Sequence, residues 1–395
     1  MVKMSNTAES TTGLKGKLAV LAVSSVMQGA NSISPILSDV KGSFPGSVST
    51  QVQMIISIAV FTGMVSSIIC GFLLRHFTKK KVLLAGLTLE TAASLFCTFV
   101  NSKLLFLYLG MGVFGLGHGL ITVTTSSYIS ENFSGNEKGT MMGFQSAVIQ
   151  GVGAVLSYIA GIISARAGWN LAFLVFLIAI PAAGAAWFLL PEDGISEAPA
   201  DDGSGRGSTG KLYRYAAMTF LAVLFYGSWF TNISLRVSEA GIGDASVAGT
   251  ANTILGVMGI IAGVMVGKVI SIAKQKTVGV ATAVEGLAML LVAFAASPAQ
   301  LYLGAFLFGC SYPLRIPASM TFAATMVDQK ASAWAITVMM TVFCLGEFLS
   351  PIVTGAIASL FGGGAQKVFL ICGVMLLVLA VIGEMTNPVK AEDVA

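Results

Sequence analysis

The nine residues LYLGMGVFG, Leu107–Gly115, recur as LYLGAFLFG at Leu301–Gly309, 194 positions further along the chain. The two copies are identical at their first four and last two positions, and each lies within a long apolar stretch. Small residues four positions apart also recur at an offset of 196, first as Gly63, Ser67 and Gly71 and again as Gly259, Gly263 and Gly267. Matches at nearly the same offset indicate an internal duplication of the chain.

The composition requires a membrane. Of the 395 residues, 55% are hydrophobic and only 10% are charged, and the mean hydropathy is +0.85. A soluble globular chain carries roughly a quarter charged residues, so the excess of apolar surface needs lipid as its solvent. The net charge of +4 is too small to indicate a nucleic-acid partner.

A helix needs about twenty apolar residues to cross the hydrocarbon core of a bilayer. By that criterion the sequence predicts an all-α integral membrane protein of twelve transmembrane helices in two six-helix repeats. The predicted spans are 17–37, 50–73, 82–100, 104–129, 139–165, 169–190, 213–236, 246–270, 276–296, 299–325, 332–358 and 366–385.

The acidic, Gly- and Ser-rich segment after Pro191 cannot bury apolar area, so it is predicted to be a linker between the two sets of six. The expected organisation is an N-terminal tail (1–16), a first bundle (17–190), the linker (191–212), a second bundle (213–385) and a C-terminal tail (386–395). With both termini cytoplasmic, sixteen Lys and Arg face the cytoplasm and five face the other side. The positive-inside rule therefore predicts a cell-membrane protein with both termini in the cytoplasm.

Over nearly its whole length the sequence resembles the major facilitator superfamily. The resemblance rests on the span count, the central linker and the repeat, and on two short motifs, GFLLRHFTKKK (Gly71–Lys81) and GWNLAF (Gly168–Phe173). Arg75 stands where that family has an aspartate. The resemblance implies a secondary transporter, functional as a monomer, in which spans 1, 4, 7 and 10 line a central cavity and spans 3, 6, 9 and 12 lie outside.

Ionisable residues at bilayer depth are functional candidates by default, because a charge there is costly. Arg315 in the tenth span presents a planar fork of donors that suits an organic anion. The alternative is that Arg315 forms a structural ion pair with Glu347 of the eleventh span. If Glu347 has no such partner, it is the candidate proton-coupling residue.

Other polar and aromatic residues on the expected cavity spans are predicted to contact a solute. His118 could titrate near neutral pH, whereas Glu90 and Glu285, on outer spans, are expected to hydrogen-bond a neighbouring helix. The predicted substrate-binding set is Arg315, His118, Gln28, Asn31, Tyr226, Trp229 and Tyr312. The predicted conformational, or gating, residues are Gly71, Lys80, Gly267 and Pro351.

No cofactor, metal site or catalytic residue is expected. The five cysteines all lie in apolar segments without metal-ligand spacing, and no HExxH motif or phosphate-binding loop is present. The sequence therefore predicts a carrier of a small organic solute, with an organic anion as the candidate substrate and the proton as the candidate coupling ion. Two alternatives stay open, a drug or metabolite efflux antiporter and a non-transporting membrane sensor on the same fold.

Overall fold

The computed structural model describes residues 14–190, 209–328 and 331–386, and within these ranges its regular structure is entirely helical. The first half comprises α1 (Leu14–Ser24), η1 (Gly29–Ile36), α2 (Leu37–Ser43), α3 (Ser49–Leu73), α4 (Lys79–Phe99), α5 (Leu104–Asn132), α6 (Gly135–Ala167), η2 (Trp169–Ile178) and α7 (Ala179–Leu189). The second half comprises α8 (Thr209–Tyr226), α9 (Ser228–Ala240), α10 (Ala245–Ala273), η3 (Lys274–Lys276), α11 (Thr277–Ala293), α12 (Pro298–Thr325), α13 (Ser332–Ser359) and α14 (Ala365–Thr386).

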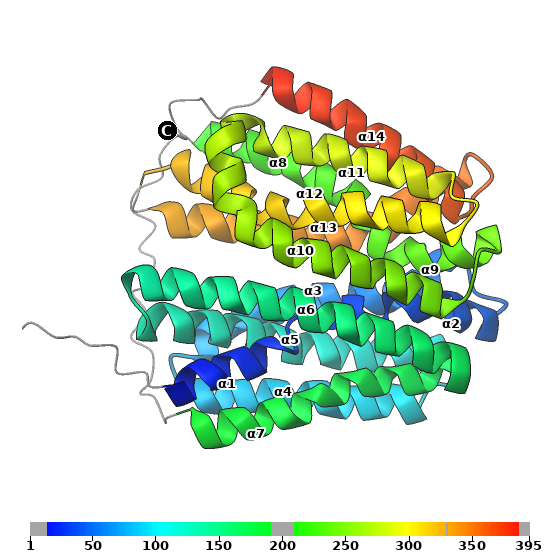
Figure 1. The fold of residues 1–395 in the computed structure, drawn as a ribbon. Helices are drawn as coiled ribbons and strands as arrows, with labels where there is room; N and C mark the ends of the chain where they lie inside the picture. Colours follow the sequence, from blue (N-terminus) through cyan, green and yellow to red (C-terminus); the bar gives the residue numbers. More distant parts are fainter. Residues whose placement is uncertain (1–13, 191–208, 329–330, 387–395) are drawn as a thin grey trace, which may run out of the picture.

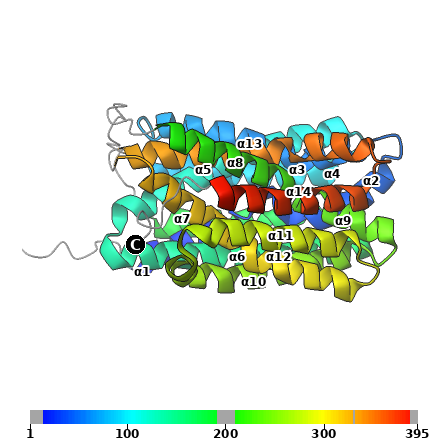
Figure 2. The same ribbon diagram turned by 90° about the horizontal axis from the view of Figure 1, so that it is seen from above.

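The helices of each half gather on one side of the molecule and run in nearly the same direction (Figures 1 and 2). We call the end of the bundle where α1 and α8 begin the α1 end, and the opposite end, where α2 and α9 finish, the α2 end. The predicted spans agree closely with these helices. For example, α3 and α12 each begin one residue before the predicted 50–73 and 299–325 and end at the predicted residue.

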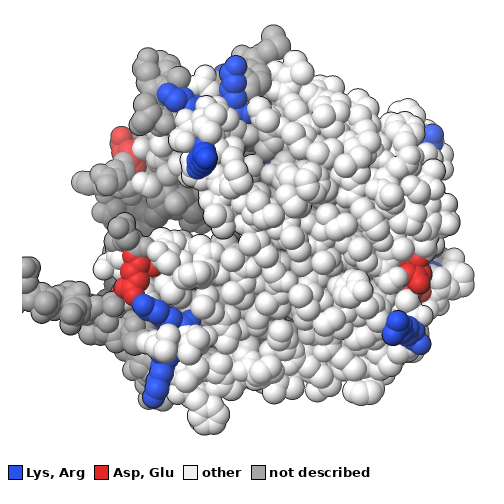
Figure 3. Space-filling model, in the orientation of Figure 1, with Lys and Arg blue, Asp and Glu red and all other residues white. Residues whose placement is uncertain are grey.

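The surface is that of a membrane protein. Within the described residues, ten helical segments are long and apolar enough to cross a bilayer. One of these ten, Ala245–Ala293, runs through α10, η3 and α11, while α12, which contains Arg315 and two internal prolines, is not among them. Figure 3 shows Lys, Arg, Asp and Glu at the two ends of the molecule and an uncharged surface between them. That uncharged surface matches the hydrocarbon layer.

The first predicted span, 17–37, is not one continuous helix. It is divided into α1, η1 and α2, and Gly29 at the division has a positive φ of 65°. Glycine adopts this conformation without steric cost because it lacks a Cβ. The seventh predicted span is likewise divided at Gly227, between α8 and α9.

Glycines bring helices within each half into backbone contact. A Cβ at Gly115 of α5 would overlap the carbonyl oxygen of Ala59 in α3, and a Cβ at Gly309 of α12 would lie 2.7 Å from the carbonyl oxygen of Leu255 in α10. Only some of the small residues that recur four positions apart make helix contacts. Gly63 and Gly259 pack against neighbouring helices, whereas Gly71, Gly263 and Gly267 would have nothing within 4 Å of a Cβ.

The two halves touch at the α2 end. The Ser38 backbone N–H donates to Ser234 Oγ (3.0 Å), and that hydroxyl donates to the Pro35 carbonyl (2.6 Å). Gln53 Nε2 donates to Asn232 Oδ1 at 2.7 Å. At the α1 end Figure 3 shows a hollow between the two halves. The structure is therefore closed at the α2 end and hollowed at the α1 end.

We expect Gly115→Ala to destabilise the protein by about 1–3 kcal/mol, because the added methyl group overlaps the α3 backbone and forces α3 and α5 apart. The matched variant is Gly71→Ala, where a Cβ meets nothing, and we expect it to be neutral or slightly stabilising. Thermal unfolding of the purified protein in detergent measures both. Equal melting temperatures for the two variants would contradict the close packing of α3 and α5.

Candidate functional site

Arg315 is held in a buried ion pair within the second half. Its side chain is 1% exposed, and its Nε donates to Glu285 Oε1 at 2.9 Å while Nη2 donates to the other carboxylate oxygen. Nη2 also donates to Thr282 Oγ1 at 2.8 Å. The partner of Arg315 is thus Glu285 of α11, which corrects the expected alternative of a pair with Glu347. Such a bidentate contact satisfies the planar guanidinium well.

A second pair occupies the corresponding helices of the first half. Glu90 of α4 is 1% exposed, and its Oε1 lies 3.1 Å from Nδ1 of His118 in α5. The expectation that Glu90 and Glu285 hydrogen-bond neighbouring helices is therefore confirmed. Each half carries one buried carboxylate next to one basic side chain.

The division in the first span positions three of the predicted residues. At Gly29 a Cβ would lie 2.9 Å from Cε1 of His118, so the chain approaches the imidazole closely only because glycine is there. Gln28 and Asn31 flank this point and line a small pocket between the halves. The pocket also contains Gln150 of α6 and Asn252 of α10.

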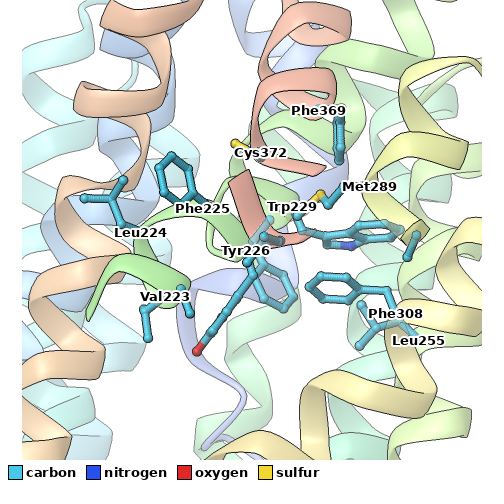
Figure 4. Close-up of a cluster of buried hydrophobic side chains, with 14 of the residues drawn as sticks. Val223, Leu224, Phe225, Tyr226, Trp229, Leu255, Met289, Phe308, Phe369 and Cys372 are labelled. Carbon is cyan, nitrogen blue, oxygen red and sulfur yellow. The ribbon is translucent and has the colours of Figure 1, made fainter. Parts of the chain in front are cut away.

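The three predicted aromatic residues form one cluster in the second half, and Figure 4 shows Tyr226 and Trp229 within it. Trp229 stacks on Phe308 with ring centroids 4.5 Å apart, and Tyr312 stacks on the same ring at 5.6 Å. The ring of Tyr226 lies 5.2 Å from Arg315 Cζ, which is a cation–π distance. Trp229 and Tyr226 are fully buried, so in this conformation they form part of the core.

Glu347 of α13 has a different environment from the paired carboxylates. Among the residues that the structure describes, none forms an ion pair or hydrogen bond with its side chain, which is partly exposed. It interacts electrostatically with Tyr226 and Tyr312. The next residue, Phe348, packs against Phe61 of α3 with ring centroids 4.7 Å apart. Glu347 therefore lies beside the contact between the two halves.

The predicted gating residues do not converge on one place. Lys80 Nζ donates to the Leu190 carbonyl at 3.0 Å and lies 5.7 Å from the Trp187 ring, so it ties the start of α4 to the end of α7. Gly71 and Gly267 are exposed, and Pro351 is buried within α13. Their gating role stays a prediction.

Several polar contacts were missed from the sequence. Arg236, the last residue of the predicted span 213–236, is 5% exposed and donates to the carbonyls of Val292, Ala293 and Ala295 at the end of α11. Asn252 accepts a hydrogen bond from Trp229 Nε1 at 3.2 Å. The sequence feature that could have indicated these contacts was a polar residue inside an apolar span, as at Asn252 and Gln53.

The described residues contain no group of three His, Cys, Asp or Glu side chains that could hold a metal ion. All five cysteines are free thiols. The polar groups brought together at mid-bundle are therefore two acid–base pairs, one separate carboxylate and a set of amides. These groups can form hydrogen bonds.

The family model described as "Major Facilitator Superfamily" matches residues 19–284, which is more than half of the chain. The chain belongs to the major facilitator superfamily. It is accordingly a multi-pass membrane transporter and not an enzyme. A comparison with curated protein sequences found no match.

Solved structures of similar fold support this assignment. A variant of the peptide transporter POT in complex with alafosfalin has a TM-score of 0.76 and 13% identity, and the match covers 95% of this chain and 96% of that one. The POT family transporter PepTSo has a TM-score of 0.73 and 11% identity, with 93% and 97% covered. A variant of the nucleoside transporter NupG has a TM-score of 0.71 and 15% identity, with 94% and 99% covered.

We expect Arg315→Gln and Glu285→Gln each to destabilise the protein by about 3–5 kcal/mol, because each leaves one buried charge without its counter-charge. The double variant Arg315→Met/Glu285→Met should be less destabilised than either single variant. Glu347→Gln, which removes a carboxylate outside any ion pair, is the matched control and should not destabilise the protein. The measurement is thermal unfolding in detergent. An Arg315→Gln variant as stable as wild type would show that the pair contributes nothing to folding.

Proposed function

We propose that this protein is a secondary active transporter that moves a small organic solute by alternating access and exchanges protons at Glu347. The observation that carries the proposal is the isolation of this carboxylate from any counter-charge among the described residues, beside the contact between the halves. An ionised carboxylate at bilayer depth is costly unless it is paired or wet. Protonation removes that cost, so a conformational change that alters access to Glu347 can load or release a proton.

The contacts of Arg315 favour a structural role over recognition of an organic anion. Both oxygens of Glu285 already accept from its guanidinium, so the pair has little net positive charge to offer a solute. An anion that took the bidentate position at Nε and Nη2 of Arg315 would have to displace Glu285. For this reason we assign proton exchange to Glu347 and helix pairing to Arg315.

The span count and the repeat belong to the same proposal. If Ala245–Ala293 crosses the bilayer twice and α12 crosses once, the ten apolar segments become twelve spans. The glycine contacts support two repeats, because Gly115 meets Ala59 while Gly309 meets Leu255, at offsets of 194 and 196. Under this proposal the two six-helix halves rock against each other around a midplane site.

We further propose that the α1 end faces the cytoplasm of a cell membrane and that the monomer is the working unit. The excess of Lys and Arg near that end supports the orientation. The contacts at the α2 end then close the outer side, and the hollow at the α1 end opens to the cytoplasm. This conformation is inward-facing.

We expect Glu347→Gln to abolish solute-driven proton movement while leaving downhill solute exchange, because glutamine keeps the shape of the side chain but cannot exchange a proton. The test uses liposomes that hold a pH-sensitive dye and a panel of organic anions, cations and neutral metabolites. Asp328→Asn, which removes an exposed carboxylate, is the matched control. Proton flux that survives Glu347→Gln unchanged would refute the proposed role.

A disulfide at the closed end should arrest the transport cycle. The hydroxyls of Ser38 and Ser234 lie 2.7 Å apart across the two halves, so Ser38→Cys/Ser234→Cys should cross-link under mild oxidation. We expect the oxidised protein to lose uptake and a reductant to restore it, whereas the single variants should be insensitive to oxidant. Full transport by cross-linked protein would contradict opening at the α2 end.

A further inference from the structure

Four amide side chains meet in one pocket between the two halves. The pocket is lined by Gln28 and Asn31 from the divided first span, by Gln150 of α6 and by Asn252 of α10, and Phe230 of α9 borders it. No charged side chain lines it. The residues come from both halves, so the pocket changes whenever the halves move relative to each other.

Asn252 has an unused donor in this pocket. Trp229 Nε1 can only donate, so the atom of Asn252 that faces it at 3.2 Å is the acceptor Oδ1. This contact fixes the orientation of the amide and leaves Nδ2 without a hydrogen-bond partner among the described residues. The side chain is 6% exposed, and an unpaired buried donor is costly. A partner for Nδ2 is therefore missing from the pocket.

Two glycines make room for the other amides. A Cβ at Gly153 would collide with the side chain of Gln28, and a Cβ at Gly259 would lie 2.5 Å from Nε2 of Gln150. The two glutamines thus occupy space that any other residue at those positions would fill. The amides are held in place by the packing of α6 and α10.

We propose that this amide pocket binds a neutral carboxamide or lactam group of the transported solute. A carboxamide offers a donor and an acceptor side by side, so it can pair with Asn and Gln side chains that offer the same two groups. A carboxylate would have no cation to neutralise it here, whereas the ring of Phe230 can pack against a planar neutral group. The inference rests on the proposed transport function and specifies its substrate class.

The access route follows from the proposed cycle. In this conformation α6 and α10 lie close together over the pocket, since Thr253 Oγ1 of α10 donates to the Ala154 carbonyl of α6 at 3.1 Å. Separation of the halves at the α2 end would widen the pocket and admit the solute. The carboxamide would then satisfy Asn252 Nδ2.

The experiment measures equilibrium binding of nicotinamide and uracil to the purified full-length protein, without a pH gradient. Nicotinate and glucose are the comparison compounds. Nicotinamide and nicotinate share a ring and differ only in amide against carboxylate. We expect at least one amide probe to bind in preference to both comparison compounds. Asn252→Leu and Gln150→Leu should each weaken that binding at least tenfold, which corresponds to the loss of about 1.4 kcal/mol. The matched control is Gln145→Leu, because Gln145 contacts Met27 and lies outside the pocket, and it should bind as wild type.

The outcomes separate this inference from the transport function. Binding retained in both Asn252→Leu and Gln150→Leu overturns the amide pocket, as does preference for nicotinate or glucose. If another solute drives proton flux in liposomes while no amide probe binds, the pocket holds water only and the transport function stands. If no solute in the panel is transported and no probe binds, both proposals fail.

Discussion

The cost of burying charge organises the interior of this protein. A charged side chain at bilayer depth costs several kcal/mol unless another charge lies next to it. In each half a buried carboxylate lies next to a basic side chain of a neighbouring helix, Glu285 next to Arg315 in the second half and Glu90 next to His118 in the first. These pairs fix how α12 is rotated against α11 and α5 against α4. The aromatic cluster depends on the same rotation, because the Arg315 guanidinium lies over the ring of Tyr226.

Glycine sets how closely the other helices approach. The backbone of α5 meets that of α3 at Gly115, and the first span turns at Gly29 to reach the His118 ring. With a side chain at Gly115 or Gly29, the helix would lie farther from its neighbour, and Gln28 and Asn31 would no longer face α6 and α10. The amide pocket is thus a consequence of backbone contacts made elsewhere in the bundle.

Hydropathy was sufficient to predict the helices but not their rotation. The bounds of α3 follow from its apolar stretch, because crossing length is a property of each segment alone. The partner of Arg315 is a property of two segments, and Glu285 and Glu347 are nearly equally distant from it in sequence.

The internal repeat contained a signal from which the partner of Arg315 could have been predicted. Glu90 and Glu285 are 195 positions apart and each precedes a span that carries a basic residue, so one acid–base pair in each half could have been expected. The division at Gly29 could not be located from the sequence, because the close approach of Gly29 to His118 depends on how two separate segments pack.

The contacts within each half are stronger than the contacts between the halves, as the proposed cycle requires. The ion pairs of the described residues, Lys17–Glu137, Lys79–Glu131, His118–Glu90 and Arg315–Glu285, each lie within one half. Between the halves, the hydrogen bonds at Ser234, Asn232 and Thr253 join neutral groups. A neutral hydrogen bond contributes a net of about 1 kcal/mol, whereas separating a buried ion pair costs about 3–5 kcal/mol. Because a rocking motion would break only the neutral bonds, each half can move as a unit, and the barrier can be set by a few weak contacts at the α2 end.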